Sequence, residues 1–131
     1  MTVVVGYKPT PEGDAALDRA AFEAKRGGED LIVVNASQSD ATEGDPAIAG
    51  ESKLAQIRGR LDQAEVRYTV RQRLRVVNPA EEIIAAAADN DASMIVIGLR
   101  RRSKVGKALF GSIAQTVLLE ADCPVVAVKA K

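Results

Sequence analysis

Histidine and tryptophan are absent from this chain, cysteine occurs once, and aromatic residues make up only 3% of the sequence. Without histidine, a Ser-His-Asp triad and a histidine-ligated metal are both excluded. The single Cys123 cannot form a disulfide within the chain, and its Val- and Ala-rich neighbourhood predicts a small buried hydrophobic side chain. The sequence also lacks an apolar run of membrane-spanning length and a secretory leader pattern at its N-terminus. We therefore expect a cytoplasmic protein with no membrane partner.

Net charge is absent too, because 18 Lys and Arg residues balance 18 Asp and Glu residues. Such a chain has no overall field that would steer it toward nucleic acid. The series Arg67, Arg71, Arg73 and Arg75 is interpreted as the solvated face of an edge strand, which protects that edge from pairing. We expect no nucleic-acid partner, so any anion binding must come from a local cluster of cations.

What the sequence does contain is aliphatic: 47% of its 131 residues are hydrophobic, mostly Val, Ile, Leu and Ala. This length predicts one domain, residues 1–131, with a core large enough to need no disulfides. Apolar runs typical of strands occur at Thr2–Gly6, 31–36, 66–71, 93–98 and 125–128. Patterns with helical spacing occur at 12–27, about 48–64, 79–90 and 113–121.

Strands that alternate with crossover helices predict an α/β fold with a parallel sheet. The continuous apolar character of the first, fourth and fifth strands predicts central positions, and the alternating third strand suits an edge. Together these features predict a three-layer, Rossmann-like sandwich around a five-stranded parallel sheet of order 3-2-1-4-5. Its topological switch point would lie between the first and fourth strands.

One segment, residues 98–113 with the sequence GLRRRSKVGKALFGSI, carries most of the chemical information. It begins where a buried strand ends, and Gly98 would let the backbone turn off that strand. It ends at Gly111 and Ser112, just before a helix predicted to open at Ile113, where unpaired N–H groups favour an anion. Five cations lie between these ends. The residues alone are compatible with a phosphate site and with an ordinary cationic turn.

The same segment resembles the C-terminal phosphate loop of universal stress proteins. ATP-binding members of that family carry Gly, two residues, Gly, nine residues, then Gly and Ser or Thr, and Gly98, Arg101, Gly111 and Ser112 fall at these spacings. The opening VVVGYKPTPEGDAALDRA and the later NPAEEIIAAA are similar to the family as well. The resemblance covers essentially the whole chain and implies an adenine nucleotide α-hydrolase-like fold.

Two positions differ from the ATP-binding members of that family. Arg101 stands where the second glycine of the loop is expected, and Lys8 stands where an aspartate contacts adenine. Lysine has no acceptor atom, but both cations suit a phosphate, and Arg101 could bind one in a bidentate manner. Tyr7 is interpreted as a pocket wall or core residue rather than a catalytic phenol, and Ala36 ends the second strand at the expected adenine pocket.

The resemblance therefore predicts a regulatory protein of the stress response that binds ATP or another adenine nucleotide. The alternative is a universal stress protein that binds no nucleotide and acts as a dimeric interaction module. We expect no enzyme activity beyond slow incidental ATP hydrolysis, because the chain has no Walker-type Gly-Lys-Ser/Thr run and no acidic cluster for Mg²⁺ at the predicted strand ends.

Assembly is predicted from the last strand, which runs from Val125 to Val128 and would leave one edge of the sheet uncovered. A bare apolar edge favours pairing with another strand. The resemblance implies a two-fold homodimer in which this strand pairs antiparallel with its mate.

Overall fold

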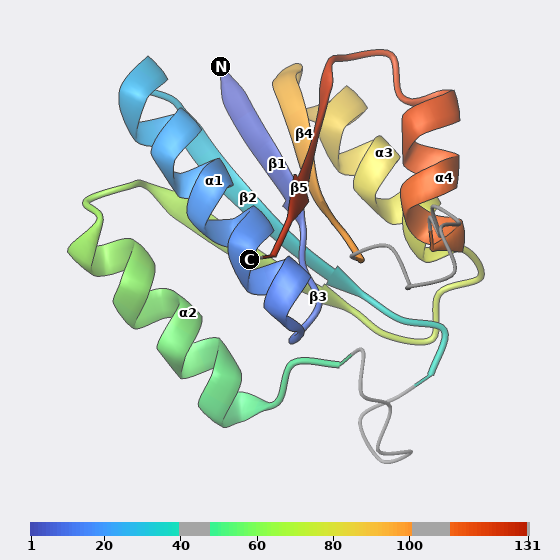
Figure 1. Cartoon of the computed structure of the whole chain (residues 1–131), viewed down its shortest axis with the longest axis horizontal. Helices are drawn as coiled ribbons and strands as arrows, with labels where there is room; N and C mark the ends of the chain where they lie inside the picture. The colour runs from blue at the N-terminus through green and yellow to red at the C-terminus, as the bar shows by residue number, and fades with distance from the viewer. Residues whose placement is uncertain (40–47, 101–110, 131) are drawn as a thin grey trace.

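Strands and helices alternate along the part of the chain that the computed structural model describes, residues 1–39, 48–100 and 111–130. The strands are β1 (Thr2–Gly6), β2 (Asp30–Ala36), β3 (Tyr68–Arg73), β4 (Ala92–Leu99) and β5 (Val125–Lys129). The helices are α1 (Pro11–Gly27), α2 (Glu51–Gln63), α3 (Pro79–Asp89) and α4 (Ser112–Glu120). Figure 1 shows this arrangement.

The sheet is five-stranded and parallel, with the order β3-β2-β1-β4-β5, which confirms the predicted topology. The central strand β1 pairs with β2 on one side and with β4 on the other. Its three valines, Val3, Val4 and Val5, are fully buried at 0% exposure. A continuous β-branched run is the pattern expected for a strand that is covered on both faces.

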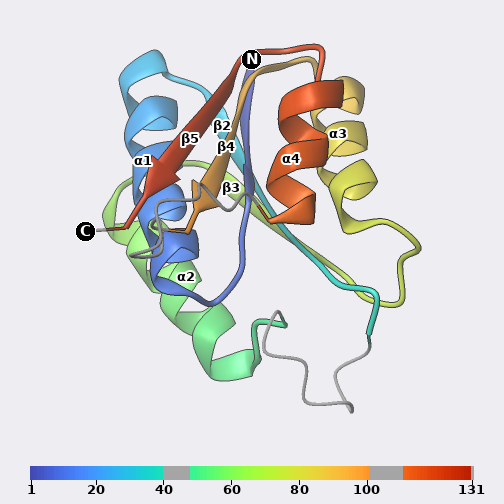
Figure 2. The same ribbon diagram turned by 45° about the vertical axis from the view of Figure 1, so that its right-hand side comes forward.

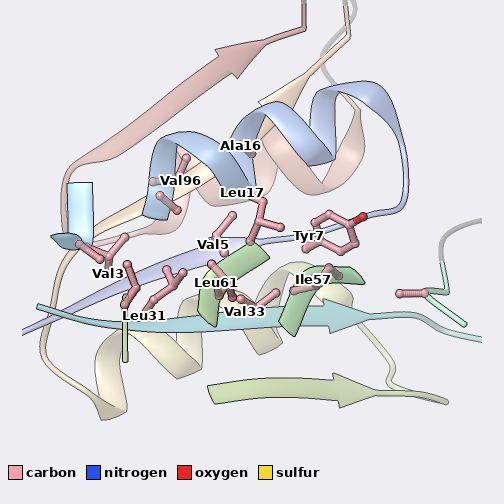
Figure 3. Close-up of a cluster of buried hydrophobic side chains, with 14 residues drawn as sticks. Val3, Val5, Tyr7, Ala16, Leu17, Leu31, Val33, Ile57, Leu61 and Val96 are labelled. Atoms are coloured by element: carbon pink, nitrogen blue, oxygen red, sulfur yellow. The ribbon is translucent and has the colours of Figure 1, made fainter. Parts of the chain in front are cut away.

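Helices cover both faces of the sheet, α1 and α2 on one and α3 and α4 on the other (Figures 1 and 2). Val3 and Val5 belong to the core under α1 and α2, together with Leu17, Ile57 and other aliphatic side chains (Figure 3). Val4 points the other way, into the core under α3 and α4. The alternation of side chains along β1 therefore supplies both cores, and the three-layer prediction is confirmed.

Two helices begin with the same local chemistry. At α1 the Thr10 side chain accepts from the Gly13 N–H, and at α3 the Asn78 side chain accepts from the Ala80 N–H. Each cap is followed by proline, which lacks an N–H and is fixed at a helical φ. Both helices therefore start at fixed points beside the carboxyl ends of the strands.

Some boundaries differ from the sequence-based expectation. Helix α2 begins at Glu51 rather than near residue 48, because the Ala49 N–H donates to Asn35 Oδ1 and Gly50 keeps an extended backbone at the N-cap. Strand β3 spans Tyr68–Arg73 instead of 66–71. Strand β5 forms an edge of the sheet, which confirms the predicted order 3-2-1-4-5; the central position suggested by its apolar run alone is wrong.

Candidate functional site

The carboxyl ends of β1, β2 and β4 meet at one end of the sheet and open into a cavity. This is the switch point of the topology, because the chain leaves β1 toward β2 on one side and β4 lies on the other. The cavity is lined by Gly6, Tyr7, Lys8, Thr10, Glu12, Gly13, Val34, Ala36, Pro79, Ile83, Ile97, Gly98, Arg100, Gly111, Ile113 and Ala114.

The connection from β1 to α1 forms one wall of this cavity and is tightly closed. The Thr10 N–H donates to the Lys8 carbonyl oxygen at 2.8 Å, and the Gly13 N–H donates to Thr10 Oγ1 at 3.0 Å. A Cβ atom added at Gly13 would lie 1.8 Å from the Lys8 carbonyl oxygen. Only glycine fits this approach, and the turn holds the exposed Lys8 at the rim of the cavity.

Tyr7 forms a buried part of the same wall, with 2% of its surface exposed. Its N–H donates to the Val34 carbonyl oxygen at 2.8 Å, and its hydroxyl donates to Asp14 Oδ1 at 2.8 Å. Lys53 Nζ lies 3.2 Å from the same Asp14 oxygen. Burial, and then the hydrogen bond to Asp14, raise the pKa of the Tyr7 phenol, which therefore stays protonated as a donor. This geometry fits a wall residue that is anchored to α1 and α2.

Asn35 is the positioning residue that the sequence analysis did not single out. Its side chain is 1% exposed and donates from Nδ2 to the Tyr7 carbonyl oxygen at 2.9 Å. Its Oδ1 accepts from the Ala49 N–H and from Gln72 Nε2, each at 3.0 Å. One amide therefore joins the end of β1, the start of α2 and the edge strand β3. The available signal was a polar residue inside the buried run LIVVNA.

Gly98 has a different role from the one predicted. It lies inside β4 rather than at a turn, and Gly28 is the described glycine with positive φ. A Cβ atom at Gly98 would lie 2.3 Å from the Glu12 carbonyl oxygen. Glycine is required here because the first turn of α1 approaches the β4 backbone, and this close packing places Glu12 at the cavity.

The start of α4 forms the opposite wall. Gly111 is the N-cap, with φ −61° and ψ 156°, and Ser112 is already the first helical residue, one position earlier than predicted. The N–H groups of the first turn have no partner within the helix and carry the positive end of its dipole. Among the described residues, nothing lies within 4 Å of a Cβ built at Gly111. In the described part of the chain, nothing therefore keeps an anion from the backbone at this point.

The structure brings most of the predicted site residues together. Tyr7, Lys8, Ala36, Gly98, Gly111 and Ile113 all line the one cavity. Ser112 lines an adjoining groove between α3 and α4 instead, and Arg101 lies outside the described residues. The cavity adds two residues from α3, Pro79 and Ile83, which the sequence analysis did not assign to it.

The chemistry of the lining is divided. The apolar surface, which suits a planar ring, comes from Val34, Ala36, Ile83 and Ile97. The charge for an anion comes from Lys8, Arg100 and the start of α4.

Across the described residues, no group of three or more His, Cys, Asp or Glu side chains could hold a metal ion. In the same part of the chain, no helix combines the length and apolarity needed to cross a membrane.

Comparison with known proteins agrees with this architecture. The model of the universal stress protein family matches residues 1–129. A universal stress protein of Mycolicibacterium smegmatis is 40% identical over 127 residues, which cover 97% of this chain and 96% of the relative. The solved structure of a universal stress protein from Archaeoglobus fulgidus has a TM-score of 0.82 at 30% identity and covers 98% of both chains. A structure of the universal stress protein from the same organism in complex with dAMP has a TM-score of 0.76 at 27% identity, again over 98% of both chains. The chain belongs to the universal stress protein family.

Proposed function

We propose that this protein binds an adenine nucleotide in the switch-point cavity and acts as a regulatory protein of the stress response. The observation that carries the proposal is the division of one cavity into an apolar slot and a cationic end at the start of α4. A base needs the first and a phosphate the second. The dAMP complex of the Archaeoglobus fulgidus relative, at 27% identity, supports a nucleotide as the ligand.

In the proposed complex, the base lies against Val34, Ala36 and Ile83, with Tyr7 behind it. The phosphates lie at the first N–H groups of α4, beside Gly111, with Lys8 and Arg100 as cationic partners. We propose Arg101, which lies outside the described residues, as a further partner from its place in the sequence. This arrangement uses the cations Lys8 and Arg100 for binding, whereas the carboxylate of Glu12, which also lines the cavity, has no assigned role. The Tyr7 phenol, whose pKa is raised by burial and by Asp14, stays protonated and serves as part of the wall.

Replacing Gly111 with valine tests the phosphate end of the site. The φ of −61° suits any residue and the described surroundings leave space, so the fold should tolerate the side chain. The valine should instead keep a phosphate from the backbone N–H groups, and losing one charge-assisted hydrogen bond weakens affinity about tenfold. Calorimetric titration with ATP and AMP measures the change.

Gly50 provides the matched control for this experiment. It is also an exposed helix N-cap without a side-chain cap, and no described atom lies within 4 Å of a Cβ built there. Gly50→Val should lower stability as much as Gly111→Val but leave nucleotide affinity unchanged. The proposed site would be contradicted if both variants lost nucleotide affinity equally, or if neither variant lost any.

The second candidate function is a dimeric interaction module without nucleotide. Lys8 favours it, because this residue lines the cavity and has no acceptor for an adenine amino group. An ultraviolet spectrum of the purified protein separates the candidates, since a chain without Trp shows co-purified nucleotide clearly near 260 nm. A protein-like spectrum, together with no heat of binding from any adenine nucleotide at millimolar concentration, would favour the module.

For either candidate we propose a homodimer that forms through β5. This strand is the edge of the sheet beside β4, and its side chains Val126 and Val128 are only half-buried. On α4, the helix that precedes β5 in the chain, Leu118 and Leu119 are 40% and 75% exposed. An apolar edge strand and exposed leucines on the preceding helix favour association with a second copy.

The register of β5 identifies the residue that tests this interface. Ile95 pairs with Val125 and donates to the Pro124 carbonyl oxygen, so Val126 directs its N–H toward β4 and Ala127 directs its N–H toward the free edge. Ala127→Pro should therefore remove an intermolecular hydrogen bond and produce a folded monomer by light scattering. Val126→Pro should also disturb the β4–β5 pairing and lower the melting temperature. A dimeric Ala127→Pro variant would exclude this interface.

A further inference from the structure

A groove adjoins the cavity on the side where α3 and α4 begin; these helices lie side by side on one face of the sheet (Figure 2). Pro79 and Ile113 line both the cavity and the groove, so the two spaces are neighbours that share a wall. A ligand whose phosphates lie at the start of α4 therefore has its free end next to the groove.

The walls of the groove are unlike those of the cavity. Among its described lining residues none is Lys or Arg, while Glu81 contributes an exposed carboxylate that takes part in none of the ion pairs between described residues. Thr116 adds a hydroxyl group, and Val77 adds an apolar side chain that is 90% exposed. The side chain of Gln38 is already engaged, since it donates to the Val77 carbonyl oxygen at 2.8 Å.

The described walls of the groove favour a neutral group over a further phosphate. A carboxylate repels a phosphate at short range but accepts hydrogen bonds from sugar hydroxyls, as acidic residues do for ribose in dinucleotide sites. The Thr116 hydroxyl can donate or accept in the same way. An exposed valine can cover the carbon atoms of a sugar ring. Glu81, Thr116 and Val77 together match a hydroxyl-rich group of no charge.

We propose that the groove binds a sugar attached to the terminal phosphate of the bound nucleotide. The preferred ligand class is then a nucleoside diphosphate that carries a second sugar, rather than a free mono-, di- or triphosphate. The inference rests on the proposed nucleotide site, because the groove receives the sugar only when the base and phosphates occupy the cavity.

ADP and ADP-ribose test the inference, since they share the base and both phosphates and differ in the second ribose. ADP-ribose carries less negative charge, so a site that recognises phosphate charge alone would bind it more weakly than ADP. We expect calorimetry to show ADP-ribose bound about tenfold more tightly, the worth of one hydrogen bond to a charged group.

Variants of neighbouring carboxylates locate the effect. Glu81→Ala should reduce the preference for ADP-ribose over ADP about tenfold while leaving the affinity for ADP unchanged. Glu82→Ala is the matched control, because Glu82 follows Glu81 in the same helical turn but does not line the groove. Its Oε1 atom lies 3.9 Å from Arg73 Nε instead. Thr116→Val provides a second variant from the opposite helix, with the same expected direction.

The outcomes separate the two proposals. If ADP binds and ADP-ribose binds no more tightly, the sugar site is wrong and the nucleotide site stands. The groove is not where the sugar lies if the wild type prefers ADP-ribose but Glu81→Ala keeps that preference over ADP to the same extent as Glu82→Ala. If neither ligand binds at millimolar concentration, the nucleotide site fails and the sugar site fails with it.

Discussion

Replacing Gly13 with alanine should lower the melting temperature by about 7 °C, although alanine is the better helix former. The new Cβ would lie 1.8 Å from the carbonyl oxygen and 2.9 Å from the carbonyl carbon of Lys8. These are backbone atoms of a turn closed by the Thr10 N–H, so they cannot rotate away as a side chain would. Overpacking of this kind costs about 3 kcal/mol, and the helix propensity of alanine offsets about 1 kcal/mol.

Gly59 offers the opposite case within the same protein. It lies in α2, is exposed, and has no described atom within 4 Å of a Cβ built on it. Gly59→Ala should therefore raise the free energy of unfolding by about 1 kcal/mol. Thermal denaturation of both variants measures the difference in sign. If Gly13→Ala were as stable as the wild type, the close approach at Lys8 would not exist in solution.

The same Gly13 substitution should reach the ligand site. Relief of the clash requires the turn from Lys8 to Thr10 to move, and both residues line the cavity. Nucleotide affinity should therefore fall together with stability in Gly13→Ala, whereas Gly59→Ala should leave affinity unchanged. Comparing these two variants therefore tests whether the turn from Lys8 to Thr10, which the fold requires, also supports the proposed nucleotide binding.

The topology was predictable because the relevant signals are local and repeated. Continuous β-branched runs such as Val3–Val5, and caps followed by proline at Thr10 and Asn78, fix where strands and helices alternate. Right-handed crossovers then leave few strand orders. Strand β5 shows the limit of this reasoning. An apolar run indicates that helices cover both faces of a strand, but it does not indicate whether another strand pairs with each of its edges.

The candidate site was predictable only in part, since its geometry depends on contacts between distant segments. Gly98 lines the cavity, but the sequence predicts glycine there for a turn, whereas its requirement for glycine comes from Glu12, a residue 86 positions earlier in the chain. Ser112 was expected beside Gly111 in the cavity, yet the first helical turn directs it to the adjoining groove. Spacing identifies such residues, but the direction in which each one points follows from packing.

Asn35→Ala should destabilise the protein by about 3 kcal/mol, one of the largest effects expected for any single side chain here. The substitution leaves the Tyr7 carbonyl oxygen and the Ala49 N–H without the partners that they have at 2.9 and 3.0 Å. Each buried group that loses its hydrogen bond costs about 1–3 kcal/mol. Gln72 loses one contact but keeps another, to the Ala49 carbonyl oxygen at 2.7 Å. Denaturant unfolding measures the loss.

Gln38→Ala provides the control, because it also removes a side-chain amide that donates to a backbone carbonyl, in this case that of Val77, but at an exposed site. Water replaces an exposed partner, so this variant should lose less than about 0.5 kcal/mol. A similar small loss in Asn35→Ala would mean that water enters the junction and that the amide is not what holds it. A large loss would show that one buried amide fixes the end of β1, the start of α2 and β3 together, and so holds the backbone of Tyr7 in the cavity wall.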